Sequence, residues 1–340
     1  MAQNLNTVTI SQFTDLIVRD FGVHNDNFVA TGNARKLFIA DDAADHTGDR
    51  KRYAEIDTET FASIKPEGDD AVKAQVQYGY EKDCIMRRFA REIDITWEMR
   101  RLNKKPEVMA KLTSLNQFCP NRMEIDLTHR ATFATATSYT DMDGLIVDTT
   151  VGDTLALVSS VHTLRSSAST YSNVITGNPT FSKGGLEIAE SQMNTQVLSH
   201  FGERRVMKFN TLFSGDDPTT INDIKQFLNS TSDVDQNNPS VTNVYYRKYE
   251  HVILPYLATT ASSAYDSTKA KYWGVVAAGQ GQMGWQAYMT VWEAPNLKTP
   301  APGNNGEDFH NDSWSYGVRG AWGICAVTGR GFLLSTGLGS

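Results

Sequence analysis

The chain has 340 residues and a formal net charge of −7, from 32 Lys and Arg against 39 Asp and Glu. Six Trp, 13 Tyr and 15 Phe can build a core, so the chain is not disordered. Three cysteines, an odd number, exclude a disulfide scaffold, and the acidic balance excludes a nucleic-acid binder held by overall charge. Roughly 90 residues are Ser, Thr, Asn or Gln, a large share beside an apolar fraction of 40%.

Membrane and secretion signals are not expected. No apolar run approaches ~20 residues, the length that crosses a bilayer as a helix, and the first residues lack the basic and apolar regions of a signal peptide. The length fits one large or two small domains. The wide separation of Cys84, Cys119 and Cys325 favours free, partly buried thiols in a reducing cytoplasm, with a structural disulfide as the alternative.

The N-terminal region predicts a short helix followed by an extended arm. Apolar residues recur at helical spacing over residues 9–21, and Gly22 suits the position after a helix end. Residues 25–49 lose this periodicity and carry an acidic cluster, and three basic residues follow at 50–52. We expect this stretch to be an arm and not a packed unit.

A long β-hairpin is predicted over residues 53–97. Its turn is the KPEGDD segment at 65–70, because Pro fixes φ and Gly permits a positive φ. Apolar and aromatic residues then alternate at 74–80 and 93–97, which is the period of a strand. Charged and amide side chains stand between them, and a lone hairpin is marginal in water. We therefore expect a partner subunit to support it.

Helices dominate the middle of the chain. Residues 98–138 have a helical pattern that we expect Pro106 and Pro120 to interrupt, with Pro120 in the first turn of a second piece. The DMDG turn at 141–144 should end it. Ser182 is expected to cap a further helix.

The C-terminal half is predicted to be rich in strands after one more helix, which should begin with Asp217 as its cap and Pro218 as its first residue. Alternating or apolar runs predict the strands, and clusters of polar residues, Gly and Pro predict the loops. The predicted strands are 155–161, 206–213, 252–257, 272–278, 287–292, 314–323 and 324–334, and the predicted loops are 165–181, 229–243 and 295–312.

Patterns typical of metal and phosphate sites do not hold up in context. The seven His are scattered without metal-ligand spacing. The run GQGQMG at 279–284 has G-x-G-x-x-G spacing, but the residues after it alternate like a strand, so a hairpin turn is expected. Residues 233–237 begin like a calcium loop, but Asn238 and Val244 stand where Gly and Glu are required.

Catalytic patterns are absent too. There is no G-x-S-x-G elbow for a nucleophilic serine. Cys119 is expected to be a buried structural thiol, and the paired carboxylates Asp141 and Asp143 are explained by a turn. We expect no enzyme, no catalytic residue, no metal and no cofactor.

One charged cluster stays open between two interpretations. Arg87, Arg88 and Arg91 are expected on the return limb of the hairpin. They are either a solvated strand face or an ion-pair patch between subunits, since Arg is enriched at interfaces.

The order of these parts resembles the major capsid protein of tailed double-stranded DNA phages, which has the α+β HK-97 fold. AREIDITWEMRRLN at 90–103 looks like the end of that family's extended loop running into its spine helix. MEIDLTHRATFATATSYTDMDG at 123–144 looks like the spine helix and its terminating turn. Residues 156–193 resemble the family's polar loop and Ser-capped helix, and residues 314–331 resemble its last strand pair.

The resemblance implies a division of the chain into the family's named parts. It implies an N-terminal arm at 1–52 and an extended E-loop at 53–97. A P-domain with the spine helix would occupy 98–205 and be revisited by a strand near 286–298, and residues 206–340 would be mainly A-domain. The E-loop tip, Lys65, Pro66, Glu67, Gly68 and Asp69, would then be an inter-subunit contact.

The resemblance also implies a function and its partners. The chain would assemble with itself into hexamers and pentamers of an icosahedral shell, in the virion capsid, around packaged double-stranded DNA held by weak non-specific contact. The arm is too short for a fused scaffolding segment, so a separate scaffolding protein is expected, with a portal protein and an optional decoration protein. Lys65 stands where some members crosslink, but a turn explains it equally.

Two other functions are weighed against this one. Encapsulins, which are cellular compartments with the same fold, resemble the chain in architecture but enclose enzymes. A β-rich hydrolase is the candidate from a different class, and no nucleophile, metal pattern or paired acid supports it.

Overall fold

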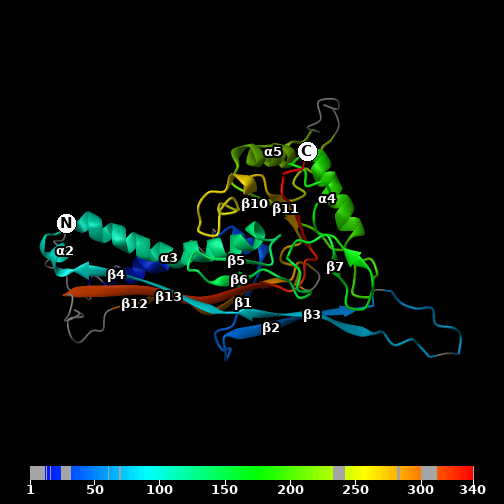
Figure 1. The fold of residues 1–340 in the computed structure, drawn as a ribbon, viewed down its shortest axis with the longest axis horizontal. Coiled ribbons are helices and arrows are strands. Elements are labelled where there is room, and N and C mark those ends of the chain that lie inside the picture. Colours follow the sequence, from blue (N-terminus) through cyan, green and yellow to red (C-terminus); the bar gives the residue numbers. More distant parts are fainter. Residues whose placement is uncertain are drawn as a thin grey trace.

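The computed structural model describes residues 12, 14–15, 17–23, 32–59, 61–68, 70–232, 242–281, 284–299 and 312–339. Figure 1 shows three parts: a long sheet beside a long helix, a second sheet with two helices, and a hairpin that reaches beyond the rest of the molecule. The described residues between 12 and 23 are helical, as predicted, although Gly22 lies inside this helix and not after it.

The long sheet has the strand order β1-β12-β13-β4. The strand β13 (Ser313–Ala326) is antiparallel to both β12 (Ala287–Lys298) and β4 (Arg87–Thr96). At the edge, β1 (Ile39–Asp42) runs parallel to β12. This pairing corrects the expectation of an unpacked arm, because the short helix η2 (Ala34–Leu37) before β1 also buries Ala34 and Leu37 in the core.

One helix, α3 (Lys105–Thr132), lies along this sheet after the short α2 (Trp97–Arg101). The predicted break at Pro120 is wrong: Pro120 is buried inside a continuous helix, while Pro106 lies in its first turn. A proline inside a helix costs about 3 kcal/mol. The packing of the helix against the sheet outweighs that cost, since α3 buries an apolar stripe at helical spacing: Val108, Leu112, Leu115, Cys119, Met123 and Leu127.

The second sheet has the order β10-β9-β11-β14 and a core of its own. Its strands are β9 (Thr211–Ser214), β10 (Glu250–Ile253), β11 (Trp273–Val276) and β14 (Phe332–Ser335).

Both helices of this block begin where the sequence predicts. The Ser182 side chain accepts a hydrogen bond from Gly185 N at the start of α4 (Lys183–Thr195). Asp217 accepts one from Thr220 N at the start of α5 (Pro218–Asn229). The remaining short elements are β5 (Ser138–Thr140), β6 (Ile146–Asp148), β7 (His162–Thr163), β8 (Thr170–Tyr171) and η3 (Ser267–Lys269).

Several predicted strands differ in the structure. Residues 155–161 form no strand, although Leu157 and Val158 are buried. The two closing strands predicted at 314–334 are divided differently, because β13 runs through Gly323 without a break. The turn at 279–284 is no hairpin, since β11 and β12 belong to different sheets. The calcium-like residues 233–237 lie outside the described residues.

The hairpin consists of β2 (Arg50–Thr58) and β3 (Val76–Ile85), which form a two-stranded sheet. It is shorter than predicted, because β4 does not return along it. After Ile85 the chain leaves the hairpin at Met86 and joins β13 of the long sheet instead.

Candidate assembly surface

The tip of the hairpin is exposed throughout. Every described residue between 61 and 75 is exposed, including Phe61 (68%), Val72 (70%) and Ile64 (92%). Of the predicted contact residues, Lys65, Pro66, Glu67 and Gly68 lie on this tip, with Gly68 at φ +87°, while Asp69 lies outside the described residues. These apolar side chains have no core to pack against within their own subunit.

The outer face of the hairpin strands is apolar toward the tip and charged toward the base, where the exposed Arg52 pairs with Asp83 and Glu81. Ile56 of β2 stands opposite Tyr78 of β3, and both are exposed. Val76 and Ile85 on β3 are exposed as well, at the two ends of the strand. Clustered exposed apolar side chains mark interaction sites more often than free surface.

The inner face of β2 carries charge and is buried, because successive side chains of a strand point to opposite faces. Glu55 and Asp57 are 1% and 4% exposed. Glu55 pairs with Arg330, and its Oε2 lies 2.8 Å from Nε2 of His200. Asp57 accepts a hydrogen bond from His200 N at 2.9 Å.

This ion cluster, defined as Glu55, Asp57, His200, Arg205 and Arg330, holds the hairpin to the body of the molecule. Burial alone would raise the pKa of Glu55, but the charge of Arg330 and the hydrogen bond from His200 hold that pKa below its usual value. Burial opposes the same shift at Asp57, whose pKa is lowered by hydrogen bonds and by Arg330 and Arg205. Breaking one partner of such a buried network is costly.

Further contacts fix the base of the hairpin. The ring of Tyr53 stacks on Tyr288 of β12 with centroids 4.0 Å apart. Lys51 pairs with Asp41 at 2.5 Å, and Lys82 pairs with Asp148 at 2.6 Å. The hairpin is therefore anchored at its base and free at its tip.

The three predicted arginines do not form one patch. Arg87 and Arg88 are neighbours on β4 and point to opposite faces of the sheet. Arg87 donates to Ile146 O at 2.8 Å, while the Arg88 guanidinium lies 5.1 Å from the ring centroid of Trp292. Arg91 is exposed on the same strand. They lie on β4 and not on the return limb of the hairpin.

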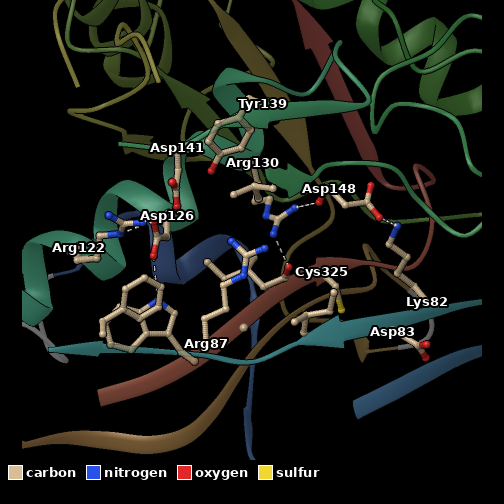
Figure 2. Close-up of a pocket in the computed structure, with 16 residues that line it drawn as sticks. Lys82, Asp83, Arg87, Arg122, Asp126, Arg130, Tyr139, Asp141, Asp148 and Cys325 are labelled. Carbon is tan, nitrogen blue, oxygen red and sulfur yellow. Dashed lines mark hydrogen bonds and ion pairs between the residues drawn. The ribbon is translucent and has the colours of Figure 1, made fainter. Parts of the chain in front are cut away.

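A charged cleft lies between the hairpin base, α3 and β13 (Figure 2). Arg122 of α3 binds three carboxylates there: Asp126 at 2.9 Å, Asp141 at 2.9 Å and Asp143 at 2.7 Å. Asp126 also accepts a hydrogen bond from Trp322 Nε1. Burial raises the pKa of Asp126 to about 6. The carboxylates tie α3 to the β5–β6 turn, so they are structural.

The described residues hold no other obvious chemical centre. Within them, no group of three or more His, Cys, Asp or Glu side chains is placed to hold a metal ion. None of the described helices is long and apolar enough to cross a membrane. The three cysteines are buried, and none of them forms a disulfide.

Sequence reasoning missed the ion cluster. Its members lie far apart in the chain, with Glu55 separated from His200 by 145 residues and from Arg330 by 275. The one local signal is the spacing of Glu55 and Asp57, two residues apart in a predicted strand. This pattern is equally typical of the solvent-exposed face of a strand.

The fold matches solved structures of phage capsids. No protein-family model matches the chain, and no curated protein matches it in sequence. The chain shares its fold with the capsid of cyanophage Pam1, with a TM-score of 0.50, 12% identity, and coverage of 88% of this chain and 87% of that one. The capsid of Ralstonia phage GP4 also matches, with a TM-score of 0.47, 12% identity and coverage of 88% and 86%.

The fold is therefore the α+β, HK-97-like phage capsid fold that the sequence predicted. The Pam1 capsid is the solved structure on which this assignment rests.

Proposed function

We propose that the chain is the major capsid protein of a tailed double-stranded DNA phage. Copies would assemble into the hexamers and pentamers of an icosahedral shell, so that the protein is structural and its place is the virion. The Pam1 likeness supports the fold on which this depends.

One observation carries the proposal: the hairpin buries charge toward its own subunit and exposes apolar side chains at its tip and on the nearby half of its outer face. A monomeric protein gains stability from the opposite arrangement, since burying apolar surface is favourable and burying charge is costly. An apolar outer face and tip are useful when a neighbouring subunit covers them. The same contact repeated by rotation closes into a ring.

The domain map follows from this proposal. The E-loop is the β2–β3 hairpin with its tip, and the spine helix is α3. The P-domain would combine α3 with the long sheet, and the A-domain would be the second sheet with α4 and α5. This division moves α4 out of the P-domain expected at 98–205 and β13 out of the A-domain expected at 206–340. A scaffolding protein, a portal protein and packaged DNA are the expected partners, with a decoration protein as an optional one.

Two matched point variants test the proposal. Ile64 on the tip and Val206 on the body are 92% and 81% exposed, so Ile64→Asp and Val206→Asp should each change the free energy of unfolding by less than ~0.5 kcal/mol. Under conditions in which the wild-type chain forms shells by negative-stain microscopy, Ile64→Asp should yield subunits or small oligomers. Val206→Asp should still form shells.

Shells of normal yield from Ile64→Asp would show that the tip is not an assembly contact. A wild-type chain that stays monomeric with and without its scaffolding partner would contradict the capsid function itself. The contents of native particles separate a phage head from an encapsulin, since DNA indicates the first and enzyme cargo the second.

A further inference from the structure

Two of the three cysteines meet where the hairpin crosses the long sheet. Cys84 is the second-to-last residue of β3, and Cys325 is the second-to-last residue of β13. Both are buried, at 0% and 3% exposure, and each thiol shifts the pKa of the other. They come from strands of two different sheets.

Gly323 makes this close crossing possible. A Cβ at position 323 would lie 2.5 Å from Ile85 O and 3.0 Å from Cys84 Sγ, so only glycine leaves room for β3 at this point. Thr290 on the adjacent strand donates a hydrogen bond to Cys84 Sγ at 3.4 Å. The Cys84 sulfur therefore lies beside position 323 of β13, two residues from Cys325 and on the same face of that strand.

Cys325 lines the charged cleft, and Figure 2 shows its sulfur among the lining side chains near Arg130. The two thiols differ in acidity, since the pKa of Cys84 is lowered and that of Cys325 is raised well above its usual value. Cys119 differs, since it lies in α3 away from this pair and burial raises its pKa to about 11.

We propose that Cys84 and Cys325 are a disulfide-forming pair, open to a small disulfide such as oxidised glutathione, that locks the hairpin covalently to β13. One thiol of the pair loses its proton, and its thiolate attacks the small disulfide, which releases one small thiolate and leaves a mixed disulfide. The second protein thiol then loses its proton and attacks the sulfur of the first, which releases the second small thiolate. The two protein thiols lose two electrons and two protons, and the small disulfide becomes two thiols.

The bond would form across the joint between the hairpin and the body. Together with the ion cluster at the other end of the hairpin base, the bond would fix the angle between the hairpin tip and the body of the molecule. The inference concerns a single subunit, so it stands or fails independently of the capsid function.

The test is thiol counting and peptide mapping on the full-length wild-type chain, kept folded and treated with oxidised glutathione. Two of the three thiols should be lost, the intact mass should fall by about 2 Da for the two hydrogens, and a non-reducing gel should show a monomer. Trypsin digestion should release residues 83–87 linked to residues 320–330, while the Cys119 peptide, 112–122, keeps its thiol.

Variants supply the matched controls. Cys119→Ser should give the same linked peptide, and Cys84→Ser should abolish it. Three retained thiols in the folded wild type, a lasting glutathione adduct on Cys325, or a linkage that includes Cys119 would each overturn the proposal. The wild-type result decides the question even if a variant fails to fold.

Discussion

At the scale of single residues, Arg330 is the centre of the ion cluster. It is 3% exposed and pairs with both Glu55 and Asp57. We expect Arg330→Met to lower the free energy of unfolding by about 3–5 kcal/mol, because it leaves the buried Glu55 without its arginine and leaves Asp57 with Arg205 alone. Denaturant unfolding of the unassembled subunit measures this.

Arg319→Met is the matched control for that change. Arg319 pairs with Glu293 at 2.7 Å, but it is 46% exposed on its side chain, so the loss should stay within about 1 kcal/mol. Equal losses of unfolding free energy in the two variants would mean that the ion cluster does not hold the hairpin to the body of the molecule.

A buried histidine predicts a dependence of stability on pH. His129 on α3 accepts or donates a 3.0 Å hydrogen bond with Thr259 and packs on Phe133 and Tyr139. Burial, together with the nearby charges of Lys269 and Arg122 and against that of Asp141, lowers its pKa from 6.5 to about 4. Its contribution to stability is therefore present above pH 6.5 and lost as the pH falls through 4.

His129→Gln isolates that contribution, since Gln still reaches a hydrogen-bond partner. From pH 7 to pH 4, the unfolding free energies of wild type and variant should converge by up to about 3 kcal/mol. Asp126 has the opposite effect on the pH dependence of stability, because its raised pKa costs stability as the pH rises toward 6. Both the wild type and the variant contain Asp126, so its effect cancels in the comparison. Parallel curves would show that His129 titrates normally.

At the scale of elements, the crossing of β3 over β13 depends on one glycine. We expect Gly323→Ala to lower the free energy of unfolding by about 1–3 kcal/mol, because the added Cβ meets the Ile85 backbone and cannot move aside. Gly184→Ala is the control: its Cβ meets nothing within 4 Å, and alanine favours the helix α4. A neutral Gly323→Ala would mean that the strands cross less tightly.

Elements with local causes could be predicted from the sequence. The starts of α4 and α5 depend on side chains within three residues of the helix end, so Ser182 and Asp217 were sufficient. The sequence misleads at Pro120 because the cost of the proline is local, while part of the packing that offsets it comes from β13, far along the chain. Within 155–161, Ala156, Leu157 and Val158 are buried, and burial alone does not make a strand.

At the scale of the whole molecule, the fold class could be predicted and the attachment of the hairpin could not. The order of arm, hairpin, long helix and strands is written along the chain. The partners of Glu55 and Cys84 come from the C-terminal strands and loops, and no local pattern connects them. The arginines at 87, 88 and 91 show the same limit, since their separation onto two faces follows from the pairing of β4 with β13.

The central position of β13 has a consequence for synthesis. The strand β13, which pairs with both β12 and β4, is among the last parts of the chain to leave the ribosome. At a synthesis rate of about 5–20 residues per second, it follows β4 by roughly 10–40 s. During that interval the long sheet lacks its middle and Glu55 lacks Arg330.

An unfinished chain would therefore have no rigid hairpin to offer a neighbour. We expect a chain ending at residue 299 to stay sensitive to protease and to be left out when complete chains assemble, as pulse labelling and sedimentation would show. Its incorporation into shells would contradict this. In the proposed shell, the place of β13 would make completion of the chain the condition for joining other subunits.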